Sequence, residues 1–284
     1  MRVLIIGASG MLGHDLGKEW TQDELIPASS KDADIRDVEQ VRALISRSRP
    51  ESIVLAAAYT DVDGSERNSD LAFAINGAGA ENVARAAAEV DARVLYVSTD
   101  YLYDGTGTRP YEPADVIAPL NVYGKSKAAG ETAVQTQVRN WCIVRTSWLF
   151  GAGGASFPEK ILNAAETRPE LTVVADQTGS PTFTRDLAGA IRELVRKEAQ
   201  GIVNVTNAGS CTWCEFAAEV LRQAGRNDVR VTPITTEQAA RLAKRPRYSV
   251  LAPTSLHAQG MTMPSWRDAV TRYLQDLRDC GKLA

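Results

Sequence analysis

The sequence predicts an α/β fold in which helices cover both faces of a doubly wound parallel sheet, with a smaller α/β domain attached. Two observations lead to this prediction. Short apolar runs alternate with helix-like segments over the first 150 residues, as in successive β-α-β units. The stretch GASGMLG at 7–13 also lies between an apolar run and a helix-like segment, which is where such a sheet places a dinucleotide-binding loop.

Each element is expected from its own pattern. Apolar runs bounded by turn residues predict strands, and apolar residues at a helical spacing predict helices. The expected strands are 2–6, 25–29, 51–58, 93–99, one within 140–151, 171–176 and 201–207. The expected helices are 14–20, 38–48, 70–90, 156–166, 184–197, 214–225 and 265–279.

The alternation becomes less regular after residue 150, which indicates two interleaved domains. We expect 1–148 and 171–199 to form a nucleotide-binding Rossmann domain, and 149–170 and 200–284 to form a substrate-binding domain. A chain of 284 residues is long enough for one or two hydrophobic cores.

Composition argues against several classes of protein. A net charge of −3 offers no basic surface for nucleic acid, and no run of about 18 apolar residues predicts a membrane span. The apolar run at the start is too short for a signal peptide, and the four cysteines suggest reduced thiols in the cytoplasm. Cys211 and Cys214 have a C-x-x-C spacing, but Thr212 and Glu215 fit a helix capping box, which we prefer to a metal or redox site.

The glycine loop has the spacing Gly7-x-x-Gly10-x-x-Gly13. One glycine allows a tight turn, one lets the backbone approach a pyrophosphate, and one lets helix and strand pack closely. The free N–H groups at the helix start, around Met11 and Leu12, favour phosphate. We therefore expect a bound dinucleotide here.

The end of the second strand bears on the choice between NADH and NADPH. An acidic residue there binds the ribose 2′-hydroxyl of NAD, whereas this chain has Ser29, Ser30 and Lys31. Two hydroxyls and a cation suit a 2′-phosphate, so we expect NADPH, with NADH as the alternative. Asp34 and Ile35 follow, where one hydrogen bond and one apolar face would hold adenine; a helix N-terminal charge is the other role open to Asp34.

Tyr123 and Lys127 lie four residues apart in the helix-like stretch NVYGKSKAAGE and therefore share a helix face. Such a pair alone also fits an ordinary solvated face. Thr99, however, ends the expected strand at 93–99, and parallel sheets bind ligands at the carboxyl ends of their strands. We expect Thr99 to lie in the cofactor crevice, near the helix that carries the pair.

These residues resemble the Ser/Thr–Tyr–Lys triad of the extended short-chain dehydrogenase/reductase superfamily. The blocks AAAYTDVDGSE, VSTDYLYDG, PLNVYGKSKAAGE, VRTSWLFG, DQTGSPTFTRDLA and KRPRYS are similar, in the same order, to those of the dTDP-4-dehydrorhamnose reductase family. The resemblance runs from residue 1 to about 250. It implies NAD(P)H-dependent reduction of the 4-keto group of dTDP-4-dehydro-6-deoxy-L-mannose to dTDP-L-rhamnose, a precursor of cell-surface polysaccharide.

The resemblance also implies roles for single residues. Tyr123 would protonate the carbonyl oxygen as hydride reaches C4, and Thr99 would hydrogen-bond the same oxygen. Lys127 would lower the pKa of Tyr123 and hold the nicotinamide ribose. Further cofactor contacts are implied at Ala57, Ala58 and Tyr59. Further substrate contacts are implied at Asp100, Tyr101, Trp148 and Arg245, the last for the nucleotide diphosphate, although core packing for Trp148 and a surface position for Arg245 are open alternatives.

Other implications are weaker. Some relatives dimerise through a metal bound by surface carboxylates; Asp15, Asp186 and Asp276 would be the counterparts, with Mg²⁺ as the ion, but solvated charges are the simpler interpretation. A monomer and a homodimer are both open. Ser156 and Tyr248 stand where asparagine is common in the family, which leaves the exact sugar open.

Four other functions fit these residues less well. A sugar-nucleotide dehydratase has glutamate where this chain has Tyr101, so elimination lacks its acid/base here. A different nucleotide-sugar reductase or an epimerase is possible, and so is a non-catalytic NADP-binding regulatory subunit. The complete triad favours catalysis.

Overall fold

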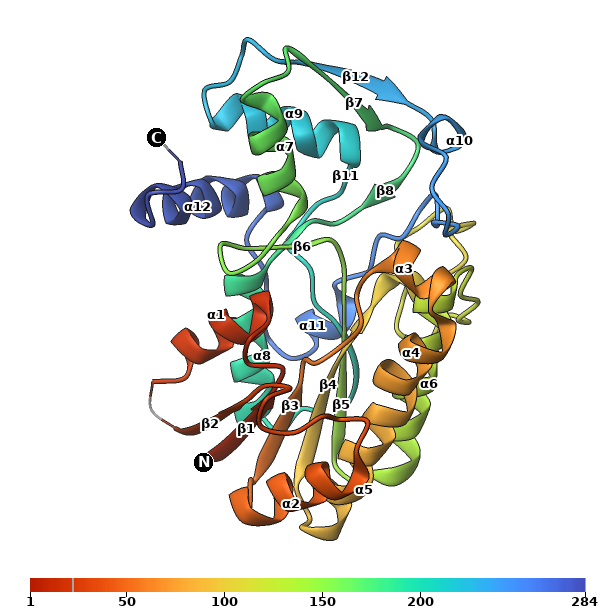
Figure 1. The fold of residues 1–284 in the computed structure, drawn as a ribbon, viewed down its shortest axis with the longest axis vertical. Coiled ribbons are helices and arrows are strands. Elements are labelled where there is room, and N and C mark those ends of the chain that lie inside the picture. Colours follow the sequence, from red (N-terminus) through yellow and green to blue (C-terminus); the bar gives the residue numbers. More distant parts are fainter. Residues whose placement is uncertain (22, 284) are drawn as a thin grey trace.

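The computed structural model describes residues 1–21 and 23–283 and has two lobes (Figure 1). The lower lobe in the figure contains a six-stranded sheet, and we call it the Rossmann lobe. The upper lobe, which we call the small lobe, contains the second half of the chain apart from a few returning segments. Within the described part of the chain, no helix is long and apolar enough to cross a membrane.

The large sheet is parallel throughout. Its strands lie in the order β10-β5-β4-β3-β1-β2. The order reverses between β1 and β3, and open sheets of this kind bind ligands at that reversal. The strands are β1 (Arg2–Ile6), β2 (Glu24–Ala28), β3 (Ser52–Leu55), β4 (Arg93–Thr99), β5 (Trp141–Thr146) and β10 (Gly201–Asn204).

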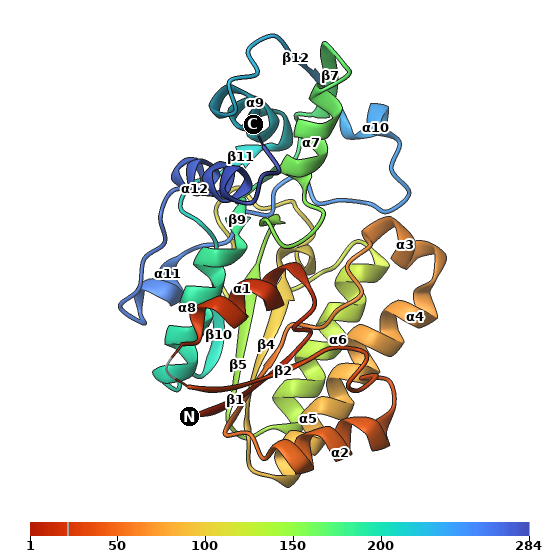
Figure 2. The same cartoon turned by 60° about the vertical axis from the view of Figure 1, so that its left-hand side comes forward.

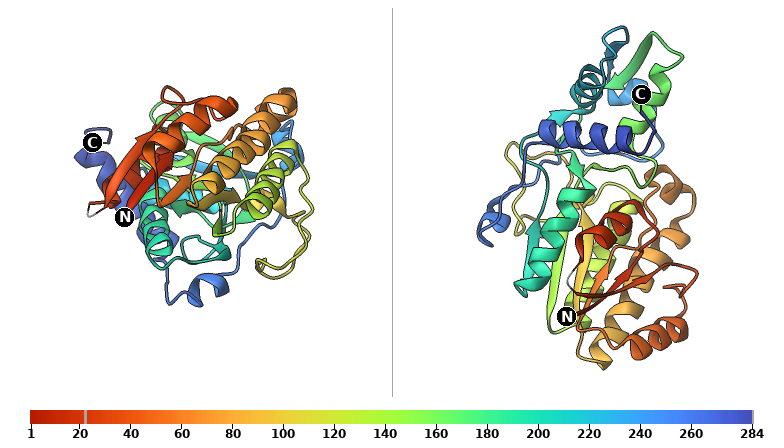
Figure 3. Two further views of the ribbon diagram at one scale, coloured as in Figure 1. Left: turned by 90° about the horizontal axis from the view of Figure 1, so that it is seen from below. Right: turned by 90° about the vertical axis from the view of Figure 1, so that its left-hand side faces the viewer.

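Helices cover both faces of this sheet, as Figures 1 and 3 show. Successive strand residues point to opposite faces, so Leu4 and Ile53 lie in one core while Val3 and Val54 lie in the other. The first core is closed by α2 (Val38–Ser48), α5 (Ala80–Glu89) and α6 (Val122–Gln137). The second is closed by α1 (Met11–Glu19) and α8 (Thr184–Arg196).

The expected helix at 70–90 is interrupted. The structure has α3 (Val62–Arg67), α4 (Ser69–Phe73), a π-helical turn (Ala74–Gly79) and then α5. The side chain of Asn76, in the π-helical turn, binds both the N–H (2.8 Å) and the C=O (3.0 Å) of Tyr59. The extra residue of the π-turn thus turns a buried amide toward the loop that follows β3.

The small lobe has an aromatic core of its own around Phe216 and Trp266, and its elements surround that core at the top of Figure 2. Thr212 and Glu215 form the predicted capping box at the start of α9. Cys211 and Cys214 are free. The helices of the small lobe are α7 (Phe157–Ala165), α9 (Trp213–Gln223), α10 (Thr236–Ala239) and α12 (Trp266–Asp279), whereas α11 (Thr254–His257) packs on the Rossmann lobe, where Leu256 joins the second core. The strands are β6 (Leu149–Phe150), β7 (Glu170–Val174), β8 (Thr178–Gly179), β9 (Thr182–Phe183), β11 (Cys211–Thr212) and β12 (Arg230–Ile234).

The expected domain bounds are wrong at two strands. β7, which we placed in the Rossmann domain, pairs instead with β12 of the small lobe. β10, which we placed in the substrate domain, pairs with β5 at the edge of the large sheet. Both strands are short and apolar, so their sequences alone do not distinguish between the two sheets.

Candidate active site

A cavity of about 1150 Å³ lies between the two lobes and contains most of the predicted site residues. Its wall is built from the glycine loop, the carboxyl ends of β3, β4 and β5, the start of α6, and residues 153–157 of the small lobe. This volume is at the upper end for a ligand pocket, which suits a dinucleotide together with a second ligand.

The glycine loop has the geometry expected for phosphate binding. Gly7 has a φ of 101°, and a Cβ there would lie 2.5 Å from the backbone N of Ala57. A Cβ on Gly13 would lie 2.2 Å from the carbonyl oxygen of Gly7. Gly10 precedes α1, whose start has neither a side-chain cap nor an acidic residue in its first turn. The N–H groups around Met11 and Leu12 therefore remain available to an anion.

The end of β2 carries no acidic residue aimed at the cavity. Asp32 turns back and accepts hydrogen bonds from the N–H and hydroxyl of Ser29, both at 2.8 Å. Ser30, Asp34 and Ile35 line the cavity, as does Arg36, which the sequence analysis missed. Lys31 is exposed and lies outside the lining.

Asp34 is not free to bind adenine alone. Its carboxylate holds the guanidinium of Arg36 at 2.9 and 3.0 Å from Nε, and this ion pair lowers the pKa of Asp34. A dinucleotide at this end of the cavity would therefore meet the cation of Arg36 as well as the hydroxyl of Ser30.

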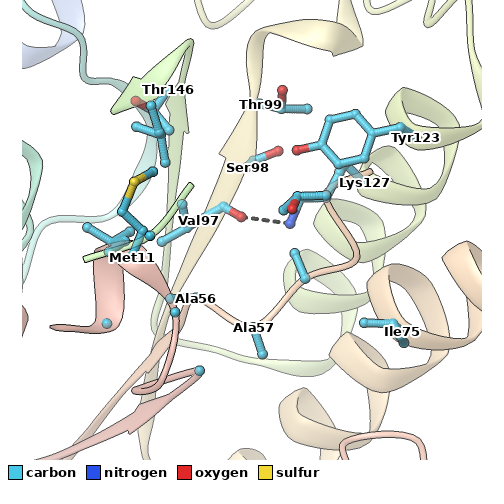
Figure 4. A pocket seen from close by; sticks show the side chains of 18 of the residues that line it. Met11, Ala56, Ala57, Ile75, Val97, Ser98, Thr99, Tyr123, Lys127 and Thr146 are labelled. Carbon is cyan, nitrogen blue, oxygen red and sulfur yellow. Dashed lines mark hydrogen bonds between the residues drawn. The ribbon is translucent and has the colours of Figure 1, made fainter. Parts of the chain in front are cut away.

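The three predicted catalytic residues meet as expected (Figure 4). Thr99 ends β4, and Tyr123 and Lys127 lie one turn apart on α6. The Thr99 hydroxyl donates to the Asp100 carboxylate at 3.2 Å and accepts from the N–H of Tyr101 at 3.2 Å, and Thr99 acts to favour the phenolate of Tyr123. The Lys127 ammonium donates to the carbonyl oxygen of Val97 at 2.7 Å.

Burial dominates the titration of this pair. It raises the pKa of Tyr123 to about 12 and lowers that of Lys127 to about 7, because a low-dielectric site disfavours the charged form of each group. The expectation that Lys127 lowers the pKa of Tyr123 is therefore wrong for the protein without ligand. Tyr123 carries its proton at neutral pH, which is the state that an acid needs.

Asn76 and Ser126 also support the site, and the sequence analysis missed both. The Asn76 amide donates to the Ser126 hydroxyl at 2.9 Å, and that hydroxyl donates to the backbone carbonyl of Tyr123 at 2.8 Å. Asn76 thereby links the π-turn to the catalytic helix and to the backbone of Tyr59. The side chain of Tyr59 lies outside the lining, whereas Ala57 and Ala58 belong to it. An asparagine inside an Ala- and Gly-rich helix was the only available signal.

The predicted substrate residues all line the cavity. Asp100 is buried, which raises its pKa to about 7, although hydrogen bonds with Ser249 and Thr99 act in the opposite direction. One of its carboxylate oxygens has no partner. The Tyr101 ring meets the Tyr123 ring edge-on at 5.9 Å. This half of the cavity is thus prepared for a polar ligand.

Trp148 adopts a positive φ of 49°, which is rare for a large side chain. Its ring stacks on Trp213 of α9 with 3.5 Å between the ring centroids. Trp213 and Phe157 also line the cavity, and the sequence analysis identified neither. Arg245 also lines the cavity but is already paired with Asp63, through two N–O contacts of 3.1 Å.

The carboxylates considered for a metal are engaged with separate partners. Asp15 accepts from the Thr184 hydroxyl at 2.5 Å, Asp186 pairs with Arg272 at 2.5 Å, and Asp276 pairs with Arg185 at 3.2 Å. Residues 1–21 and 23–283 contain no cluster of His, Cys, Asp and Glu that could hold a metal ion. The expectation of Mg²⁺ therefore has no structural support.

Known proteins resemble this chain over nearly its whole length. The family described as the RmlD substrate binding domain matches residues 1–279. SpsK of Bacillus subtilis, a spore coat polysaccharide biosynthesis protein, is 39% identical over 277 residues, which cover 97% of each chain. The dTDP-4-dehydrorhamnose reductase of Streptomyces griseus is 39% identical and covers 99% of this chain and 95% of its own. A dTDP-4-keto-6-deoxy-D-glucose reductase of Streptomyces niveus is 38% identical and covers 95% of this chain and 96% of its own.

A solved structure agrees with these relatives. The dTDP-4-dehydrorhamnose reductase of Bacillus anthracis, in complex with NADP, superposes with a TM-score of 0.95 at 40% identity and covers 97% of this chain and 99% of its own. Family, fold and site geometry therefore agree: the chain belongs to the RmlD family, the dTDP-4-dehydrorhamnose reductases of the extended short-chain dehydrogenase/reductase superfamily.

Proposed function

We propose that this protein reduces the 4-keto group of dTDP-4-dehydro-6-deoxy-L-mannose to give dTDP-L-rhamnose, with NADPH as the preferred cofactor. The observation that carries the proposal is the meeting of Thr99, Tyr123 and Lys127 in one cavity with the glycine loop. Tyr101 supports reduction over dehydration, because elimination needs an acid/base carboxylate at that position.

The cofactor fits the residues that are present. The bare start of α1 would hold the pyrophosphate, Ser30 and Arg36 would hold a 2′-phosphate, and Lys127 would hold the nicotinamide ribose. When bound, the nicotinamide supplies hydride to C4 of the sugar. Asp32 is bonded to Ser29 outside the cavity lining, and Asp34 is paired with Arg36. A cation with no free carboxylate favours NADPH over NADH.

Tyr123 supplies the proton in this proposal. Its hydroxyl keeps its proton at neutral pH and can donate that proton to the carbonyl oxygen as negative charge develops there. Thr99 hydrogen-bonds the same oxygen. The Lys127 ammonium stabilises the phenolate that remains, and it is held in place by the Val97 carbonyl. Asp100, Tyr101 and Trp148 would contact the sugar.

The first test follows NADPH consumption at 340 nm. We expect wild-type protein to oxidise NADPH with the L-mannose-configured 4-keto sugar, and more slowly with NADH. Tyr123→Phe should lower kcat by roughly 10²-fold, the scale of a lost general acid, and should leave NADPH binding unchanged. Tyr111→Phe is the matched control, because this buried tyrosine lies in a separate cluster with Tyr103 and Leu251 and outside the cavity lining.

The resemblance to the Streptomyces niveus reductase favours a second candidate substrate, dTDP-4-keto-6-deoxy-D-glucose. The same assay with that sugar distinguishes the two, since the candidates differ in configuration next to the ketone. Turnover of the D-glucose-configured sugar alone would replace the proposed substrate and retain the reaction. Cofactor binding without turnover of either sugar would contradict the proposal and favour the regulatory alternative.

A further inference from the structure

Residues 243–249 form a strap that crosses from the small lobe to the Rossmann lobe. The strap follows α10 and is attached at several points along its length. The N–H of Ala243 donates to Asp63 of α3 at 2.9 Å, and the carbonyl of Lys244 accepts from the Asn121 amide at 2.8 Å. Because these attachments join residues far apart in the chain, the strap connects the two lobes directly beside the cavity.

The strongest attachment is the ion pair of Asp63 with Arg245. The guanidinium meets the carboxylate through two contacts of 3.1 Å, and its Nη1 also donates to the carbonyl of Ala243 at 2.8 Å. Both side chains are largely buried, with 20% of Asp63 and 16% of Arg245 exposed. A bidentate pair with low exposure is geometrically well defined, and it leaves few donors of Arg245 for a ligand.

Arg245 also lies at the active site. Its guanidinium lines the same cavity as Tyr101 and Tyr123, and the Tyr101 ring lies edge-on to the ring of Tyr123. Asp63 therefore fixes a residue that shares the cavity with the proposed acid. Aromatic pairs of this kind have a preferred geometry, so the orientation of one ring limits that of the other.

A second attachment acts on the same helix. Asn121 is the N-cap of α6, and its side-chain oxygen accepts from the N–H of Gly124 at 2.8 Å while its side-chain amide donates to the strap. The strap is thus bound to the start of the helix that carries Tyr123, two residues before the proposed acid.

We propose that Asp63 and Arg245 are positioning residues, which fix the strap and act through Asn121, at the start of α6, to hold Tyr123 in the geometry for proton donation. This inference rests on the proposed function. It replaces the expected role of Arg245, contact with the nucleotide diphosphate, by a role inside the protein. The two roles predict different kinetics. In the positioning role Asp63 supports Arg245, whereas in the binding role Asp63 competes with the diphosphate for Arg245.

The test compares Asp63→Asn, Arg245→Met and the double variant in the NADPH assay. Positioning predicts that each single variant lowers kcat by roughly 10-fold, with little change in the KM of the sugar. It also predicts that the double variant loses no more than the worse single variant, because both changes break one unit. Arg245→Lys should not restore kcat, since an ammonium cannot make the two parallel contacts with the Asp63 carboxylate.

The matched control is Arg241→Met. Arg241 also approaches Asp63, at 3.9 Å, but its side chain is 64% exposed. We expect the kcat and KM of the Arg241→Met variant to equal those of the wild type. If Arg245→Met instead raises KM and Asp63→Asn lowers it, at unchanged kcat, Arg245 binds the diphosphate and the positioning role is wrong. Wild-type kcat in both single variants would also overturn the proposal.

A measurement without sugar separates this inference from the proposed function. Wild type, Asp63→Asn, Arg245→Met and the double variant are unfolded in urea, and the urea concentrations at their midpoints are compared. If the ion pair connects the lobes as described, the double variant unfolds at the same urea concentration as the less stable single variant. Additive midpoint shifts would contradict the bridge. A coupled bridge in a protein that reduces neither sugar would contradict the proposed function alone.

Discussion

At the scale of single residues, the active site depends on burial more than on charge. Tyr123 and Lys127 are neighbours on one helix, yet burial moves both toward their neutral forms. A tyrosine whose pKa is about 12 keeps its proton until negative charge forms on the substrate. The lysine, with a pKa of about 7, can gain charge when a phenolate appears beside it. The pair is therefore suited to donating one proton at the moment of hydride transfer.

Asp100 gives a prediction for stability against pH. Its folded pKa of about 7 lies above the ordinary value of 3.8, so its contribution to stability is complete below pH 3.8 and is lost as pH rises toward 7. The loss amounts to at most about 4 kcal/mol. Asp100→Asn should remove this slope, which urea unfolding between pH 4 and pH 7 measures.

Asp104→Asn serves as the control for that experiment. Hydrogen bonds from Thr106 lower the pKa of Asp104. The contribution of Asp104 to stability is therefore lost as pH falls, whereas that of Asp100 is lost as pH rises. If the Asp100 variant keeps the wild-type slope, Asp100 does not titrate in this range and its carboxylate is better solvated than the structure indicates.

At the scale of elements, the glycine loop permits a matched pair of substitutions on one helix. Gly13→Ala would place a Cβ 2.2 Å from the carbonyl oxygen of Gly7, whereas a Cβ on Gly17 meets nothing within 4 Å. We expect Gly13→Ala to displace the loop and to weaken NADPH binding by more than 10-fold, or roughly 1.4 kcal/mol. Gly17→Ala should leave binding unchanged and stabilise the protein by about 0.5–1 kcal/mol, because alanine favours the helix.

Fluorescence titration with NADPH and urea unfolding check both variants. Equal cofactor affinity in Gly13→Ala and wild type would show that the close approach of α1 to the loop is not needed for binding. Weak NADPH binding in both variants would mean that any change in α1 disturbs binding, and that the contact of Gly13 with Gly7 has no special role.

The elements that sequence predicted best are those with local signals. Strand 93–99 and helix 38–48 have the expected bounds because apolar pattern and flanking turns coincide there. The capping box at Thr212 was predictable for the same reason. The π-turn was not, because it depends on distant contacts: a Cβ on Gly130 would lie 2.3 Å from the carbonyl oxygen of Asn76. Tertiary packing, not local propensity, sets that turn.

The active-site residues also divide into those that a local sequence pattern predicts and those that it does not. The positions of Thr99, Tyr123 and Lys127 follow from strand ends and helix spacing, so sequence could place them together. Trp213 and Arg36 reach the cavity through the arrangement of whole elements, and no local pattern marks them. The membership of β7 and β10 was mistaken because strand pairing joins segments far apart in sequence, as in the pairing of β7 with β12.

At the scale of the molecule, the two lobes have separate cores and share one cavity. The Rossmann lobe supplies the glycine loop and the triad, and the small lobe supplies Phe157 and Trp213. We infer that cofactor binds mainly to the first lobe and that the sugar nucleotide bridges to the second. Ligands should then protect different backbone amides from hydrogen exchange, since exchange reports local opening.

Hydrogen exchange with mass spectrometry tests which lobe binds each ligand. NADPH alone should slow exchange in 7–13 and at the end of β4, and adding deoxythymidine diphosphate should extend the protection to 153–160 and the start of α9. Peptides from α12 serve as the internal control, because that helix packs in the small-lobe core and contributes no residue to the cavity. Protection by the diphosphate that stays within the Rossmann lobe would show that the nucleotide does not reach the small lobe. In that case Phe157 and Trp213 would contact a ligand other than the nucleotide.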